Sequence, residues 1–149
     1  MILYLDTSAI LKRYFQEPFS EDVAMQWNSA EAIVSSSVAY AETVATIYRK
    51  KKDADLDDAI IQETIEIFTS DWSSFIQVEV TNDLNPHLDN LLKKYELRGF
   101  DAIHLASAFI IYEQLPLDFF FACFDHRLNQ AAKLEGFESF CTNPGQWYL

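Results

Sequence analysis

The sequence of 149 residues is poor in glycine, proline, cysteine and basic residues. Its 3 glycines and 4 prolines exclude collagen-like and low-complexity chains, which are built from these residues. Its 11 lysines and arginines stand against 23 aspartates and glutamates, which gives a net charge of −12. Phosphate binding by charge alone needs a positive surface, so this composition excludes a general basic coat for nucleic acid. An acidic protein that acts on nucleic acid therefore needs metal ions or a local basic patch.

Long apolar runs and export signals are also missing. No window approaches the roughly 18 apolar residues of a membrane span. No basic segment precedes the first apolar run, which Asp6 interrupts, so this run does not have the form of a signal peptide. The two cysteines, Cys123 and Cys141, are far apart in a chain without an export signal, which favours free thiols over a disulfide. We therefore expect a cytoplasmic protein with no membrane segment.

Apolar residues, by contrast, are plentiful. Hydrophobic residues make up 50% of the chain and aromatic residues 15%, which is enough to build a core and excludes intrinsic disorder. A chain of this length buries roughly 70% of its unfolded surface when it folds. There is no internal repeat and no linker rich in Gly, Ser or Pro. The sequence therefore predicts a single domain over residues 1–149.

Short apolar segments typical of strands alternate with longer segments of helical periodicity. The predicted strands are Ile2–Leu5, Ala32–Ser35, Phe75–Val80, Phe119–Phe124 and Phe137–Cys141. The predicted helices are Ala9–Phe15, Ser20–Ser29, Val38–Lys52, Ala59–Trp72, Leu84–Tyr95, Phe100–Glu113 and Asp125–Leu134. This alternation predicts an α/β fold with a parallel sheet that helices cover on both faces.

Four acidic residues stand apart from the solvated acids of the chain. Asp6 and Asp125 each follow a predicted buried strand directly, at the sheet edge where ligands bind in such folds. Asp101 lies in the first turn of an apolar helix, and Glu42 lies within another. An ionised carboxylate in apolar surroundings is unfavourable unless it is paired or metal-bound. No basic residue lies within three positions of Asp6 or Glu42.

Two interpretations of these carboxylates remain open at this point. Clustered hard oxygen ligands suit Mg²⁺ or Mn²⁺, so the four acids could share one metal site. Alternatively, Asp6 and Asp101 could cap or begin helices, and Glu42 could point to solvent.

The segments around these acids resemble a known family. They read LDTSA from Leu5, AET from Ala41, RGFDAIHLA from Arg98 and FDHRL from Phe124. Together they are similar to the PIN-domain ribonucleases, and in particular to the VapC-type toxins of bacterial and archaeal toxin–antitoxin systems. The segments occur in the family's order and extend over most of the chain.

The resemblance implies both a fold and an activity. The fold is a three-layer α/β/α sandwich with a parallel sheet of about five strands, which agrees with the strand count above. The activity is that of an Mg²⁺- or Mn²⁺-dependent endoribonuclease, which hydrolyses phosphodiester bonds of single-stranded or looped RNA with metal-activated water. The resemblance further implies a cognate antitoxin protein as partner and a homodimer, the state that the family often adopts.

The resemblance also assigns roles to residues of this sequence. Asp6 and Asp101 correspond to the central metal ligands, and Glu42 and Asp125 complete the acidic site, directly or through water. Thr7 and Ser8 are expected to orient Asp6 or the waters of the metal. One residue departs from the family pattern: Cys123 stands where Thr or Ser is usual, and we interpret it as a small core residue. We interpret His104, three residues after Asp101, as a core or supporting histidine and not as a catalytic base.

Two alternative functions are compatible with the same residues. One is a catalytically silent PIN-like module that binds a partner protein. The other is a different metal-dependent nuclease or a phosphatase, although Ser8 argues against phosphatases with an Asp-x-Asp nucleophile. Metal-dependent RNA cleavage by the purified chain would separate the silent module from the ribonuclease.

Overall fold

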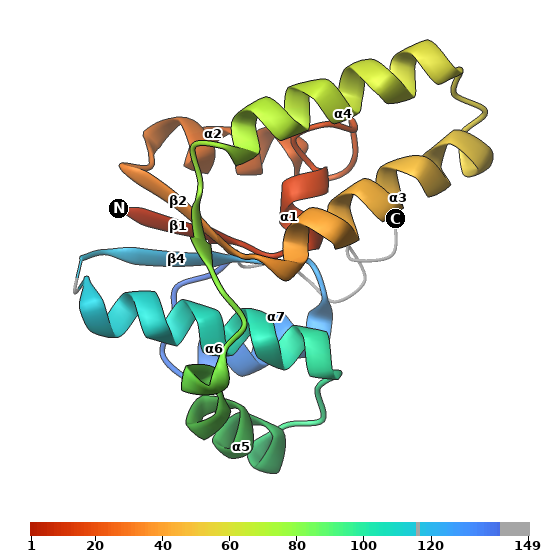
Figure 1. Cartoon of the computed structure of the whole chain (residues 1–149). Coiled ribbons are helices and arrows are strands. Elements are labelled where there is room, and N and C mark those ends of the chain that lie inside the picture. Colours follow the sequence, from red (N-terminus) through yellow and green to blue (C-terminus); the bar gives the residue numbers. More distant parts are fainter. Residues whose placement is uncertain (116, 141–149) are drawn as a thin grey trace.

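The computed structural model describes residues 1–115 and 117–140, and its centre is a parallel sheet (Figure 1). Four strands form this sheet, β1 (Ile2–Leu5), β2 (Ala32–Ser36), β3 (Ile76–Val78) and β4 (Phe119–Ala122). They lie in the order β3-β2-β1-β4, and every neighbouring pair is parallel. The prediction of a parallel α/β sheet is thereby confirmed.

Two of the predicted strands are shorter in the structure because their ladder partners end. The predicted strand 119–124 stops at Ala122, and the amide of Phe124 donates instead to Ser8 Oγ. The predicted strand 75–80 keeps only Ile76–Val78, because the neighbouring β2 ends at Ser36.

The fifth predicted strand, 137–141, is reduced to one contact in the described part of the chain. Glu138 forms a single parallel bridge with Phe120 of β4, and Cys141 lies outside the described residues. The described sheet therefore has four strands where about five were expected.

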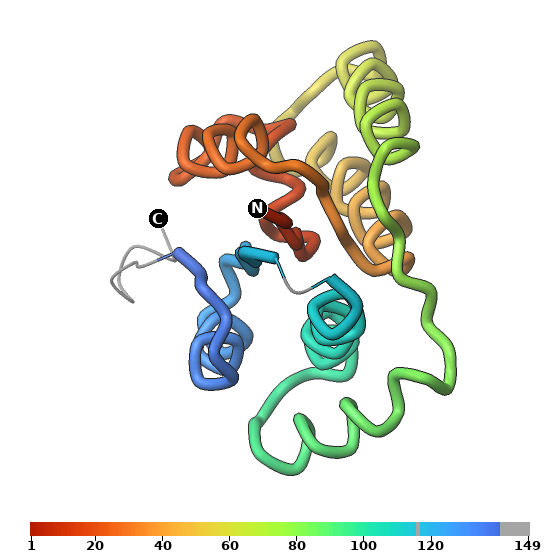
Figure 2. The backbone as a smooth tube through the Cα atoms, turned by 90° about the vertical axis from the view of Figure 1, so that its left-hand side faces the viewer, coloured from red at the N-terminus to blue at the C-terminus, as the bar shows by residue number. Residues whose placement is uncertain are grey.

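Helices cover both faces of the sheet (Figures 1 and 2). One face carries α1 (Thr7–Leu11), α2 (Ser20–Ser29), α3 (Val38–Asp53) and α4 (Asp58–Trp72). The other face carries α5 (Asn85–Lys94), α6 (Gly99–Gln114) and α7 (His126–Leu134), with a short 3-10 turn, η1 (Asn82–Leu84), before α5. The arrangement is the expected α/β/α sandwich. Among the described residues, no helix combines the length and the apolar character that crossing a membrane requires.

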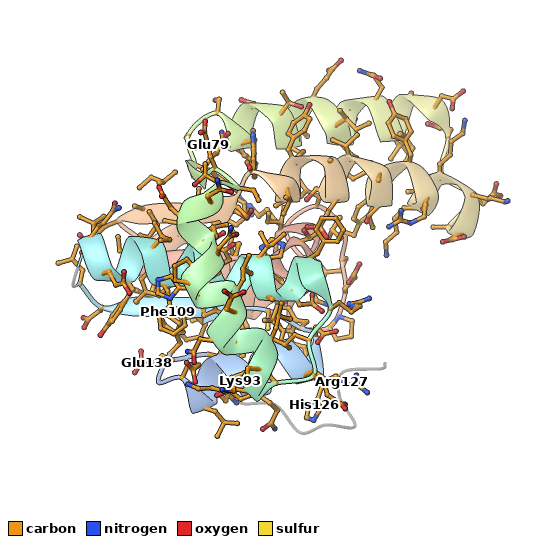
Figure 3. All side chains as sticks on the ribbon, turned by 60° about the horizontal axis from the view of Figure 1, so that its bottom comes forward. Glu79, Lys93, Phe109, His126, Arg127 and Glu138 are labelled. Atoms are coloured by element: carbon orange, nitrogen blue, oxygen red, sulfur yellow. The ribbon has the colours of Figure 1, made fainter. Side chains whose placement is uncertain are left out.

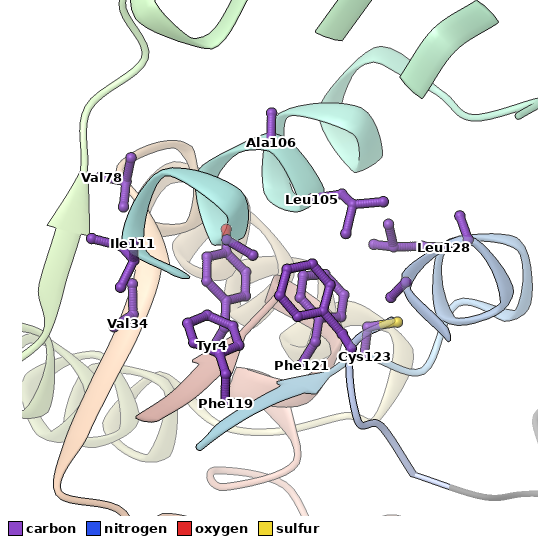
Figure 4. Packing of buried hydrophobic residues seen from close by; sticks show 14 of the residues in the cluster. Tyr4, Val34, Val78, Leu105, Ala106, Ile111, Phe119, Phe121, Cys123 and Leu128 are labelled. Atoms are coloured by element: carbon purple, nitrogen blue, oxygen red, sulfur yellow. The ribbon is translucent and has the colours of Figure 1, made fainter. Parts of the chain in front are cut away.

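The central strand β1 is buried on both faces, which explains its continuous apolar sequence. Leu3 and Leu5 pack in the cluster with α1, α3 and α4, whereas Ile2 and Tyr4 pack in the cluster with α6 and α7. Figure 4 shows Tyr4 and Phe121 side by side beneath α6, and their rings stack with centroids 5.1 Å apart. Because successive side chains of a strand point to opposite faces of the sheet, β1 contributes to two separate cores.

The topology defines one functional edge. The chain runs from β1 outward to β2 and β3, and then returns to place β4 on the other side of β1. Between β1 and β4 the strand order reverses, and in open α/β sheets ligands bind at the carboxyl ends of the strands at this point. Asp6 follows β1 there, and Asp125 follows β4.

Candidate active site

The four predicted site carboxylates line one cleft of about 290 Å³. Each comes from a different element: Asp6 follows β1, Glu42 lies in α3, Asp101 lies in the first turn of α6, and Asp125 follows β4. The cleft is lined by Asp6, Thr7, Ser8, Leu11, Glu42, Arg98, Asp101, His104, Phe124 and Asp125. The structure therefore brings together residues that lie up to 119 positions apart in the chain.

Asp6 caps a helix, as one of the two interpretations expected, and it also lines the cleft. Its carboxylate is 4% exposed and caps α1, with Oδ1 accepting from the Ala9 amide at 2.9 Å and from Ser8 Oγ at 2.7 Å. Burial raises the pKa of Asp6 to about 6, and the nearby charge of Asp101 acts in the same direction. The electrostatic effect of the neighbouring His104 opposes this rise most, and the hydrogen bonds from Ser8 and Ala9 oppose it further.

Ser8 connects the two strands that flank the cleft. Its hydroxyl donates to Asp6 after β1 and accepts from the Phe124 amide after β4, at 2.9 Å. The predicted role of Ser8 in orienting Asp6 has this contact as its structural basis. One hydroxyl thus fixes the carboxylate and the end of the adjacent strand together.

Glu42 is held by two hydrogen bonds to one of its oxygens. Oε1 accepts from Thr7 Oγ1 at 2.8 Å and from His104 Nε2 at 3.0 Å. Burial acts to raise the pKa of Glu42, but the hydrogen bonds from His104 and Thr7, aided by the charge of Arg98, outweigh it and lower the pKa. Glu42 therefore stays ionised at neutral pH.

His104 connects Glu42 to the buried Tyr4 of the core. It is 2% exposed, and its Nδ1 lies 2.9 Å from the hydroxyl of Tyr4, which is itself fully buried in β1. Burial raises the pKa of Tyr4, so its hydroxyl remains protonated and pairs with Nδ1. The ionised carboxylate of Glu42 can only accept, so Nε2 carries a proton and donates to it. This places His104 in the supporting position that we expected from the sequence.

Asp101 and Asp125 share a cation, Arg98. Arg98 Nε donates to Asp101 Oδ2 at 3.1 Å, and Nη2 donates to Asp125 Oδ2 at 3.4 Å. Asp125 also caps α7, with Oδ1 accepting from the Leu128 amide at 3.0 Å. Burial raises the pKa of Asp101, the bond from Arg98 opposes the rise, and the charge of Asp125 adds to it.

Sequence reasoning did not single out Arg98. The available signal was its spacing, because an arginine three residues before an acid in the first helical turn can pair with it. Its second partner, 27 positions later, was not predictable from spacing.

The model of the PIN-domain family matches residues 3–134. The chain belongs to the PIN-domain family. It is 29% identical to Ribonuclease VapC49 of Mycobacterium tuberculosis over 91% of this chain and 92% of that protein. It is 30% identical to Ribonuclease VapC46 of the same organism, over 90% and 92% of the two chains. The family resemblance of the four segments is thereby confirmed.

Two solved structures share the fold. The crystal structure of Mycobacterium tuberculosis VapC20 superposes with a TM-score of 0.60, covering 91% of this chain and 95% of that one at 16% identity. VapBC2 from Rickettsia felis, solved with a DNA fragment from its promoter, superposes with a TM-score of 0.61 at 15% identity. It covers 96% of this chain and all of that one.

Cys123, the departure from the PIN-domain pattern, does not line the cleft. It is fully buried in the core cluster on the α6–α7 face of the sheet (Figure 4). Its Sγ lies 3.7 Å from the carbonyl oxygen of Asp125, a distance typical of a weak sulfur hydrogen bond. Its interpretation as a small core residue is confirmed, and its thiol is free.

The chemistry of the PIN-domain cleft suits a hard divalent cation. Four carboxylates face it, and two of them already share the positive charge of Arg98. As they stand, the described residues contain no group of three or more His, Cys, Asp or Glu side chains placed to hold a metal ion. Asp101 and Asp125 instead hold a guanidinium. The donor set therefore fits the metal in kind, and a metal would have to share these oxygens with Arg98.

Proposed function

We propose that this PIN-domain chain is a VapC-type endoribonuclease toxin that hydrolyses RNA phosphodiester bonds in the cleft between Asp6, Glu42, Asp101 and Asp125. The observation that carries the proposal is the convergence of four carboxylates from four elements at the point where the strand order reverses. The curated relatives, which are named as ribonucleases and match over nine-tenths of the chain, support the same activity.

Asp6 and Asp101 would hold Mg²⁺ or Mn²⁺, and Glu42 and Asp125 would complete the site, directly or through water. Such a cation, when bound, lowers the pKa of a water molecule and offsets charge on the scissile phosphate. Within the described chain, both hydrogen bonds to Asp6 go to Oδ1 and both to Glu42 go to Oε1. The second oxygen of each carboxylate is thus left for a ligand, in an orientation that its neighbours fix.

The net charge of −12 supports a selective enzyme restrained by a partner. An acidic surface binds bulk RNA weakly, so cleavage should depend on the metal and favour particular RNA sites. The same surface would attract a basic segment of a cognate antitoxin. A cytoplasmic location and a homodimer belong to this proposal as properties expected of the family.

The test is cleavage of a pool of RNA hairpins with randomised loops, followed by sequencing of the new ends. We expect the purified chain to cut selected loops with Mg²⁺ or Mn²⁺ and to be inactive in EDTA. Asp6→Asn and Asp101→Asn, each made separately, should abolish cutting. Activity that survives EDTA would refute the role of the metal, and wild-type activity in either folded variant would refute the site. A wild-type chain that binds an antitoxin but cuts no RNA would favour the silent binding module.

A further inference from the structure

Arg98 occupies a distinctive place at the rim of the cleft. It immediately precedes α6, and it is the one lysine or arginine among the described residues that line the cleft. Its side chain is 78% exposed, although it contacts two carboxylates whose side chains are 15% and 32% exposed. In a protein with 23 acids, a single exposed cation thus faces the space where an RNA phosphate would lie.

The contacts of Arg98 are of a kind that is easily exchanged. The guanidinium makes one hydrogen bond to each of two carboxylates, at 3.1 and 3.4 Å, and not a two-bond fork with either of them. Exposed ion pairs of this kind contribute little to stability, because water and salt screen them. Their position matters more than their strength, because both bonds end on Oδ2 atoms of residues proposed to hold the metal.

This arrangement makes Arg98 pairing and metal binding competitors. A divalent cation on an Oδ2 atom of Asp101 or Asp125 would take up the negative charge that now binds Arg98, and its own positive charge would repel the guanidinium. Resting on the proposed function, we infer that Arg98 is a substrate-binding residue with two alternative partners. It neutralises Asp101 and Asp125 in the metal-free protein and binds an RNA phosphate once these carboxylates hold metal.

The chemistry of the side chain favours phosphate as the second partner. A guanidinium presents parallel N–H groups that match two phosphate oxygens, and it stays charged at all physiological pH values. The backbone of Arg98 is fixed at the start of α6, three residues before Asp101, so the released side chain stays at the cleft. Lys12 and Lys50, the lysines nearest in sequence to the segments of Asp6 and Glu42, both pair with Glu17. Arg98 is therefore the best-placed phosphate ligand in the described site.

The first test measures metal binding without RNA. Mn²⁺ is titrated calorimetrically into the wild type, Arg98→Ala and the control Arg127→Ala, which removes an exposed arginine of α7 outside the cleft (Figure 3). We expect Arg98→Ala to bind Mn²⁺ about three- to tenfold more tightly, because a competitor with two exposed ion pairs is removed. The control should stay within about twofold of the wild type. Unchanged or weaker binding by Arg98→Ala would overturn the competition.

The second test measures phosphate contact through the salt dependence of RNA affinity. The labelled hairpin pool is bound to each protein in Ca²⁺, chosen to occupy the site with little or no cleavage, and again in EDTA. For Arg98→Ala in Ca²⁺, the slope of log affinity against log salt should decrease in magnitude by about 0.7, the value for one contact with single-stranded RNA. In EDTA the slope should not change, and Arg98→Lys should keep the wild-type slope in Ca²⁺.

The outcomes separate this inference from the proposed function. An unchanged slope in Ca²⁺, or no binding of the pool at all, overturns the phosphate role of Arg98. If Arg98→Ala shows both the tighter Mn²⁺ binding and the smaller salt slope, but the wild type never cleaves RNA, the ribonuclease proposal is overturned and the inference stays intact. A wild type that cleaves RNA, with an Arg98→Ala variant of equal metal affinity and equal slope, does the reverse.

Discussion

The two halves of the cleft hold their carboxylates in different ways. Asp6 and Glu42 are fixed by donors from the core and from α1, each through two hydrogen bonds to one oxygen. Asp101 and Asp125 are instead joined by one exposed guanidinium. The first half is preorganised by the fold, whereas the second half is held by a contact that another cation can replace. The difference suggests that ligand exchange is concentrated in the second half.

The largest expected effect comes from removing a carboxylate from the half formed by Asp6 and Glu42, which we call the fixed half. Asp6→Asn keeps a carbonyl-type oxygen for the Ser8 and Ala9 donors but removes the negative charge from the cleft. We expect RNA cleavage to fall by at least about a hundredfold, the scale of losing one major electrostatic group in an active site. Single-turnover cleavage at saturating Mg²⁺ measures this loss. A decrease of less than tenfold would show that the fixed half does not carry the chemistry.

The same substitution should stabilise the metal-free protein. The pKa of Asp6 rises from 3.8 to about 6 on folding, so ionisation of Asp6 destabilises the native state increasingly as pH rises from about 4 to above 6. Asp6→Asn removes this penalty, so its free energy of unfolding should exceed the wild-type value by up to about 3 kcal/mol above pH 7. The gain should disappear near pH 4. Urea denaturation in EDTA at both pH values checks the prediction, and a less stable variant at pH 8 would contradict it.

The contact of Tyr4 with His104, the residue that holds Glu42, can be tested by a substitution that keeps the aromatic ring. Tyr4→Phe removes the hydroxyl that contacts His104 Nδ1 and leaves this buried nitrogen without its partner. We expect a loss of about 1–2 kcal/mol in the free energy of unfolding. A cleavage rate that falls about tenfold would accompany it, because the ring that orients Glu42 becomes less constrained. The control is Tyr112→Phe, which changes an exposed tyrosine of α6 and should leave both quantities nearly unchanged.

The position of a site residue could be predicted from the sequence only where a local signal marks it. The apolar run Ile2–Leu5 and the acid after it placed Asp6 at the functional edge, because buried parallel strands and their carboxyl ends follow general rules. The position of Glu42 beside Asp6 rested on the family resemblance, since a helix residue 36 positions away has no local signal of contact.

The contacts that distinguish the two halves were not predictable from one sequence. The Tyr4–His104 and Arg98–Asp125 contacts join residues 100 and 27 positions apart, and periodicity carries no information on such distances. The predicted end of the strand β4 was wrong for the same reason. The apolar run continues to Phe124, but the Phe124 amide donates to Ser8 on another segment, and the strand stops at Ala122.

The smallest expected effect concerns Cys123, which lies near Asp125 in the half of the cleft formed by Asp101 and Asp125. Cys123→Ser introduces a hydroxyl, as the family pattern has it, at a position where the thiol is fully buried near the Asp125 carbonyl oxygen. The hydroxyl can donate to this carbonyl, so we expect a stability change below about 1 kcal/mol. Cleavage should change less than about twofold, because the side chain lies in the core and not in the cleft. A large gain in cleavage would show that residue 123 positions Asp125 after all, and the second half of the cleft would then be under core control like the first.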